Sequence, residues 1–519
     1  MLFNSYLFLL VFLPVTLLGF FQIGRYSQLV AALWLFMMSL FFYGWWNPIY
    51  VGLLLGSIVF NYSIGLSLSR EALPRHSQCK YWMLFIGIVS NIGLLAYYKY
   101  ANFFVENINT SLQLDWQFTT VMLPLGISFF TFTQIAFLVD AYRGEVKESN
   151  FIYYGLFVTY FPHLLAGPVL HHKEMIPQFT LQASYQVDWR NISVGTTIFT
   201  MGLFKKVWLA DSIAPYANPV FTIAANGGTL TFLEAWGGAL AYTFQLYFDF
   251  SGYSDMAIGL SRLFGVRLPL NFNSPYKAVN IIDFWRRWHM TLSRFLRDYL
   301  YFSLGGNRKG VALRYLNLIV TMVLGGLWHG AGWTFVVWGL LHGVFLVINH
   351  AWHQMRKALG HNIEQFTIVG RFTGIALTFF VVVIGWVFFR ANSFDAAFSM
   401  LEGMFGLNGV ILPSSWYGLP HWRVTALLED FGTQYGVLSA YENLDNAWYW
   451  IVALWICVWV APNTQQIMAA YNPALEKIIH PARYFLFKES RAFALLVGGV
   501  LGVSLLSMRR VSEFLYFQF

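Results

Sequence analysis

Two histidines in an almost uncharged part of this chain are well suited to carry out chemistry. His329 follows the run Leu316–Leu327, which has no charged residue, and the next strongly polar side chain is His342. An ionisable side chain at membrane depth is costly, so a functional role is its default interpretation. His289 lies upstream in an arginine-rich segment. Because imidazole exchanges protons near neutral pH, the pair indicates proton transfer inside an apolar protein.

The arginine-rich segment 283–299 predicts an amphipathic helix. At about 100° per residue, its tryptophans and leucines fall on one face and its arginines and aspartates on the opposite face. Such a helix lies at the membrane interface or forms a re-entrant element. Its arginines either anchor it to lipid phosphates or serve a site. His289 falls beside the apolar face, so we expect it to point into protein or lipid, as a packing or a catalytic side chain.

Other polar and small residues have two interpretations each. His342 either forms a hydrogen bond between helices or takes part in the chemistry. Gly330 and Gly332 either break the helix after His329 and open room for a ligand, or allow close helix packing. A polar patch interrupts another apolar run and either lines a tunnel or forms hydrogen bonds between helices; its members are Asp249, Ser251, Tyr253 and Asp255.

Membrane helices must position these side chains. The chain has 519 residues, of which 57% are hydrophobic and only 11% are charged, whereas soluble proteins average about 25% charged residues. The apolar runs are too long and too evenly apolar for the alternating strands of a β-barrel. Runs near the bilayer-spanning length of about 20 residues lie at 5–21, 28–46, 49–68, 81–98, 118–139, 151–170, 192–213, 231–260, 315–330, 332–350, 367–389, 448–462 and 491–507. They predict an all-α, polytopic integral membrane protein with about 11–13 spans and additional re-entrant or interfacial helices.

The basic residues indicate the topology. Arg25, Arg70 and Arg143 lie in alternate loops of the first half. Because basic loops face the cytoplasm, the N-terminus is expected to face outward. The net charge of +8 then reflects membrane topology, and we expect no nucleic-acid partner.

The chain shows no linker or internal repeat, so we expect a single membrane domain over 1–519. Within it, about 391–447 is a polar loop region, and 508–519 forms a C-terminal tail. The cysteines Cys79 and Cys457 have no metal-ligand spacing, so we expect neither a disulfide scaffold nor a bound metal.

Five strings of residues in this order resemble the membrane-bound O-acyltransferase family, and most closely its bacterial alginate O-acetyltransferase branch. They cover a signature core of about 120–345. The strings are Leu123-Pro-Leu-Gly-Ile-Ser-Phe-Phe, Phe161-Pro-His-Leu-Leu-Ala-Gly-Pro, Gln245-Leu-Tyr-Phe-Asp-Phe-Ser-Gly-Tyr-Ser-Asp, Phe284-Trp-Arg-Arg-Trp-His289 and Gly326-Leu-Trp-His329-Gly.

The resemblance implies a helical bundle around a transmembrane tunnel. It makes His329 the essential histidine and His289 the second signature position. Burial keeps an imidazole neutral, so we expect His329 to act as general base, while His289 orients the thioester or steadies the oxyanion. The tunnel contacts are then expected from the polar patch, from Trp328, and from arginines that bind either coenzyme A or lipid head groups, namely Arg286, Arg287 and Arg294.

The last residues, Phe514-Leu-Tyr-Phe-Gln-Phe519, resemble the ending of a small partner protein of the related D-alanyl transferases. By that analogy Tyr516 is a candidate acyl carrier. The alternative is an aromatic tail anchored at the membrane interface.

These features predict a multi-pass enzyme of the bacterial inner membrane. We expect it to move acetyl groups from cytoplasmic acetyl-CoA, its donor substrate, to an exported polysaccharide such as alginate, through an acyl-accepting periplasmic protein, with no bound cofactor. An alternative acceptor is peptidoglycan, cellulose or a D-alanyl carrier. An alternative of another class is a non-catalytic transporter of a polymer or lipid intermediate, although the paired halves typical of transporters are not evident.

Overall fold

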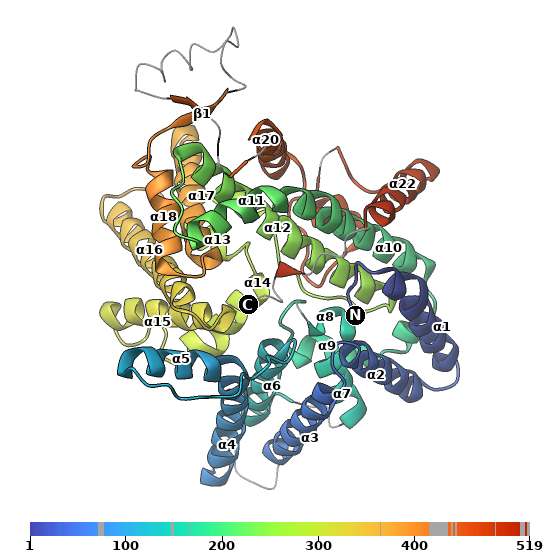
Figure 1. Ribbon diagram of the computed structural model, residues 1–519. Coiled ribbons are helices and arrows are strands. Elements are labelled where there is room, and N and C mark those ends of the chain that lie inside the picture. The colour runs from blue at the N-terminus through green and yellow to red at the C-terminus, as the bar shows by residue number, and fades with distance from the viewer. Residues whose placement is uncertain are drawn as a thin grey trace.

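Helices form nearly all of the secondary structure in the computed structural model of the protein (Figure 1). The structure describes the chain except for residues 71–76, 147–149, 166, 364, 415–433, 437, 439, 442–443, 483, 509–513 and 516–519. Among the described residues the only strands are two short parallel ones, β1 (Ile411–Pro413) and β2 (Gln434–Gly436). The predicted all-α class is confirmed.

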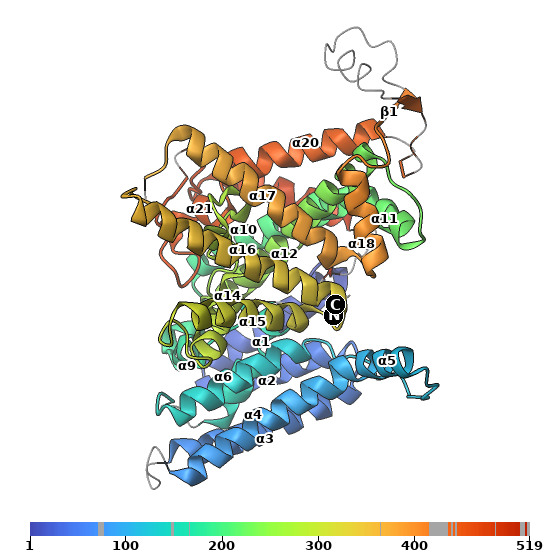
Figure 2. The same ribbon diagram turned by 90° about the vertical axis from the view of Figure 1, so that its left-hand side faces the viewer.

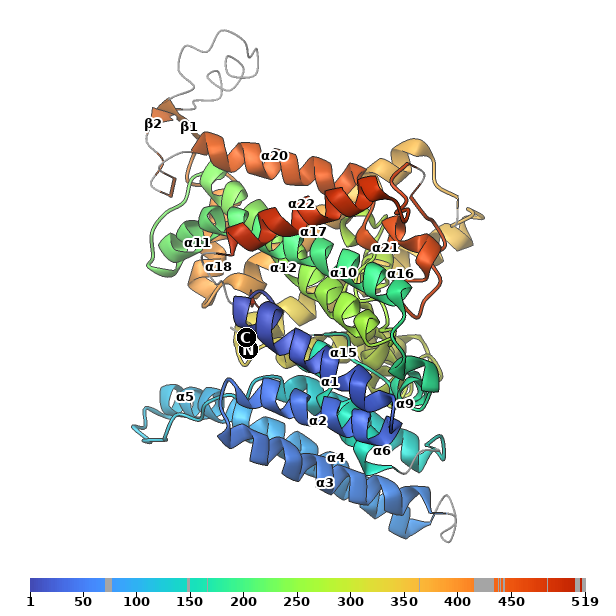
Figure 3. The same ribbon diagram turned by 90° about the vertical axis from the view of Figure 1, so that its right-hand side faces the viewer.

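The first helices lie together on one side of the molecule, shown in blue to cyan in Figures 2 and 3. Serine caps define two of their starts, because the Ser27 and Ser77 side chains accept backbone N–H groups of the first turn. The elements are η1 (Phe8–Phe12), α1 (Leu13–Gly24), α2 (Gln28–Gly44), α3 (Ile49–Ser69), α4 (Gln78–Leu95), η2 (Ala96–Tyr100), α5 (Ala101–Leu112) and α6 (Ile127–Tyr142).

The centre of the fold is a long helix, α12 (Phe232–Leu263), which is buried along most of its length. It packs closely on α10 (Trp189–Phe204): a Cβ on Gly202 would lie only 2.6 Å from the Gly252 carbonyl oxygen. Small residues allow this approach of two helix backbones. The neighbouring elements are α7 (Phe151–Thr159), α8 (Phe161–Leu164), α9 (His172–Phe179), η3 (Gln182–Tyr185), η4 (Lys205–Ala210) and α11 (Asp211–Ala225).

The rest of the chain begins with short elements and continues with long helices. The short elements are η5 (Pro275–Lys277), α13 (Ile281–Trp285), α14 (Met290–Phe295) and η6 (Leu296–Tyr301). After them come α15 (Val311–His329), α16 (Trp333–Ala358), α17 (Ile368–Arg390), α18 (Phe394–Met404), α20 (Leu444–Val460), α21 (Thr464–Ile467), η8 (Ala469–Tyr471) and α22 (Arg491–Ser507).

Five helical segments among the described residues are long and apolar enough to cross a membrane: Ile49–Ser69, Gln78–Leu112, Val311–His329, Trp333–Ala358 and Ile368–Arg390. Shorter apolar helices fall where further spans were predicted, such as Phe8–Gly24, Gln28–Gly44 and Arg491–Ser507. The chain is therefore a polytopic, multi-pass membrane protein.

Residues near the two ends of the described chain pack against the central helix α12 and against each other. The Tyr253 ring on α12 lies between the rings of Phe3 and Phe514, at centroid distances of 4.8 and 4.6 Å. The Tyr6 hydroxyl also donates to the Leu505 carbonyl oxygen at 2.7 Å. Both terminal segments therefore pack against the core.

The predicted amphipathic helix over 283–299 is wrong as a continuous element. The chain leaves the helical path after Trp285 and resumes it at Met290, because His289 adopts a left-handed backbone with φ 44°. Two predicted spans also differ: the run 118–139 becomes helical only at Ile127, and the run 151–170 divides at Tyr160 before Pro162.

Candidate active site

His289 and His329 come together although they lie on different elements. Their ring centroids are 6.2 Å apart, and their exposed fractions are 0% and 4%. The break in the predicted amphipathic helix thus turns His289 into the protein. Two buried imidazoles at this separation can act on one reacting group between them.

His329 is the last residue of α15. The helix ends there because Gly330 takes an extended conformation, and a Cβ at Gly330 would lie 2.2 Å from the Phe335 ring. The imidazole packs edge-on against Trp338 and Phe389, with centroids 5.1 and 5.3 Å away. Aromatic walls therefore hold the ring in one orientation, and the predicted helix break after His329 is confirmed.

His289 is held by an amide that the sequence analysis missed. Its Nδ1 lies 2.9 Å from Asn271 Oδ1, which also accepts the Thr291 hydroxyl at 2.9 Å and faces the Thr291 backbone nitrogen at 3.4 Å. Because a backbone N–H only donates, this Asn271 atom is the oxygen, and His289 Nδ1 must carry the shared proton. His289 Nε2 is then the accepting nitrogen of the neutral ring. Asn271 lies in the run Pro269-Leu-Asn-Phe-Asn-Ser-Pro-Tyr276 upstream of His289, and nothing in that run marks it as the partner of the histidine.

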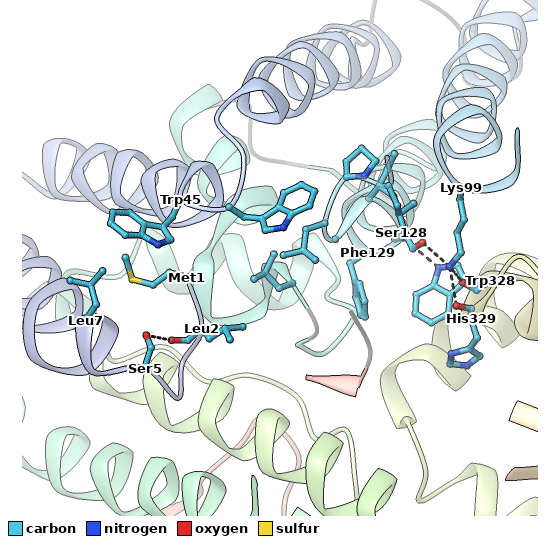
Figure 4. A pocket seen from close by; sticks show the side chains of 17 residues that line it. Met1, Leu2, Ser5, Leu7, Trp45, Lys99, Ser128, Phe129, Trp328 and His329 are labelled. Atoms are coloured by element: carbon cyan, nitrogen blue, oxygen red, sulfur yellow. Dashed lines mark hydrogen bonds between the residues drawn. The ribbon is translucent and has the colours of Figure 1, made fainter. Parts of the chain in front are cut away.

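A cavity of about 530 Å³ reaches His329 (Figure 4). At one end it is lined by Lys99, Ser128, Trp328 and His329, and at the other by the N-terminal segment from Met1. His329 therefore faces a space that can admit a ligand.

A second cavity, the charged basin, has a volume of about 470 Å³ and different lining residues. Burial, and then the nearby Arg294, lowers the pKa of His171 in its wall. All three of its acids have donors: Asp140 accepts from the Tyr299 hydroxyl, Asp298 from Arg297, and Glu145 from Lys173. The basin is lined by Asp140, Arg143, Glu145, His171, Lys173, Asp298, Tyr299, Phe302 and Arg308.

A stack of aromatic rings connects the two cavities. Tyr299, in the basin wall, packs on Phe295 with centroids 5.0 Å apart. Phe295 stacks on Phe132 at 4.3 Å, and Phe132 on Trp328 at 5.4 Å, beside His329. This aromatic column fills the space between the charged basin and the histidine pair.

The polar patch lies in ion pairs and hydrogen bonds between elements. Asp249 Oδ1 lies 2.5 Å from Lys206 Nζ, and Asp255 Oδ2 lies 2.6 Å from Lys205 Nζ. Tyr253 stacks on the terminal phenylalanines, and Ser251 is buried. The arrangement matches hydrogen bonding between helices, and none of the four lines either cavity described above.

The three arginines expected at coenzyme A also lie outside both cavities. Arg287 pairs with Asp283 at 2.8 Å, and Arg294 forms a two-pronged pair with Glu174 at 2.6 and 2.9 Å. Arg286 is exposed. The cations that line the basin are instead Arg143, Lys173 and Arg308.

The C-terminal tail enters the core close to His289. The Leu515 N–H donates to Asp249 Oδ2 at 3.1 Å, and the Phe514 ring lies 5.6 Å from Phe250. Phe250 in turn meets His289 edge-on at 4.9 Å. Tyr516 lies outside the described residues.

His342 is fully buried among Trp285 and Trp338, with centroids 5.2 and 4.9 Å away. Neither of its ring nitrogens has a hydrogen-bond partner among the described residues, so no hydrogen bond between helices explains it. It lines neither cavity described above.

Comparison with known proteins identifies the family. Residues 16–391 match the model of the MBOAT, membrane-bound O-acyltransferase family. The chain is 46% identical over 440 residues to a peptidoglycan O-acetyltransferase of Helicobacter pylori, covering 79% of this chain and 81% of that protein. It is 44% identical over 411 residues to a probable alginate O-acetylase of Azotobacter vinelandii, covering 78% of each. A teichoic acid D-alanyltransferase of Streptococcus thermophilus is 27% identical over 292 residues, with 53% of this chain and 70% of that protein covered. The chain therefore belongs to the membrane-bound O-acyltransferase family and is an O-acyltransferase enzyme.

Proposed function

We propose that the protein is an inner-membrane O-acetyltransferase that carries acetyl groups from cytoplasmic acetyl-CoA to an exported polysaccharide, through an extracytoplasmic partner protein. The observation that carries the proposal is the buried pair His289 and His329, whose rings lie 6.2 Å apart beside a cavity. The relatives named for alginate and for peptidoglycan support a polymer acceptor. Their near-equal identities keep peptidoglycan as the second candidate beside an alginate-like polysaccharide.

The charged basin supports a donor from the cytoplasm. Its lining includes Arg143, which lies in one of the basic loops that the positive-inside rule assigns to the cytoplasm, and Arg308, which is followed by Lys309. Arginine binds phosphate through paired N–H groups, so Arg143 and Arg308 suit the phosphates of coenzyme A. The thioester then approaches the histidines along the aromatic column.

In the proposed reaction, His329 takes the proton of the attacking hydroxyl while the hydroxyl oxygen bonds to the thioester carbonyl carbon. The carbon–sulfur bond then breaks, and the proton passes to the leaving thiolate. His289 orients the reacting groups through its accepting Nε2. The bond from its Nδ1 to Asn271 argues against the oxyanion role, because an accepting nitrogen cannot donate to an oxyanion.

Tyr516 is the proposed first acceptor. Asp249 and Phe250 hold Leu515 and Phe514, and Phe250 also contacts His289. The last described residues before Tyr516 are therefore held on the stretch of α12 that contacts His289. The phenol oxygen of Tyr516 would bond to the acetyl carbon as the carbon–sulfur bond breaks, and its proton would pass through His329 to the leaving thiolate. A hydroxyl of the partner would then take the acetyl group and return a proton to the Tyr516 oxygen. Peptide mass spectrometry of enzyme trapped with acetyl-CoA should find acetyl on Tyr516, whereas a fully active Tyr516→Phe enzyme would exclude this step.

Purified enzyme with radiolabelled acetyl-CoA tests the whole proposal. His329→Ala should lower transfer by at least about 100-fold, the smallest effect typical of a general base, while the exposed control His361→Ala keeps full transfer. Normal polymer export with His329→Ala, together with no transfer by the wild type, would favour the transporter alternative. Mass spectrometry of surface glycans after deletion then distinguishes an acetylated polysaccharide from peptidoglycan.

A further inference from the structure

Residues from a distant part of the chain donate hydrogen bonds to the last turn of α15. The final four carbonyl groups of a helix have no partner within the helix. Here the Gly326 carbonyl accepts the Gly330 N–H at 3.3 Å, and the Leu327 carbonyl accepts the Tyr100 hydroxyl at 2.7 Å. The Trp328 and His329 carbonyls both accept Lys99 Nζ, at 2.5 and 3.0 Å (Figure 4).

Lys99 and Tyr100 reach this helix end together because they lie in a π-helical turn. The turn η2 (Ala96–Tyr100) separates α4 from α5, and Tyr100 departs from the helical path with φ −113° and ψ −10°. A π turn inserts one extra residue, which redirects the side chains around it, and such turns occur often at functional sites. The distortion therefore allows two consecutive side chains to serve one partner helix.

The charge of Lys99 is expensive where it lies. It belongs to the candidate span Gln78–Leu112 and forms no ion pair with a carboxylate among the described residues. Its partners are the negative end of the α15 dipole and Ser128 Oγ at 3.5 Å. A lysine kept inside a membrane for contacts with one helix terminus indicates a function at that terminus.

We infer that Lys99 and Tyr100 are positioning residues that fix His329 against the cavity. The inference rests on the proposed role of His329 as general base. Both residues act through the backbone carbonyls of the turn that carries the imidazole, so they set the place of the ring. Because Lys99 also lines the cavity, the effect on KM separates this role from substrate binding. A displacement of about 1 Å at a reacting group can cost about 100-fold in rate.

Three variants and a matched control test the inference in the full-length purified enzyme. Lys99→Met keeps the length of the side chain and removes its donors, Lys99→Arg keeps donors for two carbonyls, and Tyr100→Phe removes one hydroxyl. Tyr97→Phe is the control, because this tyrosine of the same turn is 53% exposed. We expect kcat to fall at least about tenfold in Lys99→Met with KM for acetyl-CoA unchanged, several-fold in Tyr100→Phe, and little in Lys99→Arg or Tyr97→Phe.

A second measurement does not need turnover. Diethylpyrocarbonate modifies accessible imidazoles, and peptide mass spectrometry assigns the rate to His329. Its modification rate should change at least about threefold in Lys99→Met and not in Tyr97→Phe, even if the wild type shows no acetyl transfer. Unchanged kcat and unchanged modification in Lys99→Met would overturn the inference. A higher KM with unchanged kcat in Lys99→Met would also overturn the inference and make Lys99 a substrate-binding residue. A loss of kcat that is explained entirely by a lower melting temperature would overturn it as well.

Discussion

Replacing Asn271 by leucine should disable His289 without removing the imidazole. Asn271 Oδ1 accepts from His289 Nδ1 and from the Thr291 hydroxyl, both at 2.9 Å. Asn271→Leu is similar in size and leaves both buried donors without this acceptor. Each lost acceptor costs about 1–3 kcal/mol, so the free energy of unfolding should fall by about 2–6 kcal/mol in total.

At the assay temperature, Asn271→Leu should lose more acetyl transfer than its unfolded fraction alone explains. Without Asn271 the His289 ring can carry its proton on either nitrogen and can rotate, so its accepting Nε2 is no longer guaranteed. Loss of a hydrogen bond that orients a functional histidine typically costs about 10–100-fold. We therefore expect kcat for acetyl transfer to fall by about that factor in the fraction of Asn271→Leu that remains folded.

The assay measures kcat and thermal unfolding on the same detergent-purified samples. Asn271→Asp retains an acceptor and should keep most of the activity. Thr291→Val leaves the bond between Asn271 and the ring but removes the hydroxyl that donates to Asn271 and accepts the Val169 N–H. It should therefore lower stability by about 1–3 kcal/mol and leave kcat nearly unchanged. Wild-type kcat in folded Asn271→Leu would refute the reasoning, as would an equal loss of kcat in Thr291→Val.

Three further predictions concern the helix packing, the aromatic column and the basin. Gly202→Ala places its Cβ 2.6 Å from a backbone oxygen and should lower the free energy of unfolding by about 1–3 kcal/mol. The control Gly52→Ala meets nothing within 4 Å and should leave the free energy of unfolding unchanged. Equal melting temperatures for the two variants would contradict the close contact. Phe132→Ala should raise acetyl-CoA hydrolysis without acceptor, measured as thiol release, because water gains access along the column; unchanged hydrolysis would argue against a barrier there. Arg308→Ala should raise KM for acetyl-CoA about tenfold, because one charge-assisted hydrogen bond is lost, and should leave KM for acetyl-pantetheine unchanged. The control Lys309→Ala should change neither KM. Equal effects of Arg308→Ala on both donors would contradict phosphate binding.

Much of the fold and the end of α15 could be predicted from local sequence. The apolar runs are long enough to identify a polytopic helical protein, and Gly330 marks the end of the helix at His329. Both are local signals that need no partner. The approach of His289 to His329 came only from the family resemblance, because no periodicity brings two distant segments together.

The sequence pattern failed where a distant partner decides the structure. The amphipathic pattern over 283–299 favours one continuous helix. The structure differs because the Asn271 carbonyl accepts the Met290 backbone N–H, which holds the chain where His289 adopts its left-handed backbone. The ion pairs of Asp249 and Asp255 depend on lysines of η4, which lie on another element. No local pattern singles out Lys99, since its role depends on the end of a helix more than 200 residues away.

The aromatic column has a consequence for the cell that houses this enzyme. Two cavities in one membrane protein would conduct protons and ions if a chain of water molecules connected them. Stacked rings between Tyr299 and Trp328 leave no polar group at Phe295 or Phe132 for a chain of water molecules to follow. The column therefore offers water and protons no polar path between the two cavities, which protects the ion gradient of the membrane that holds the protein.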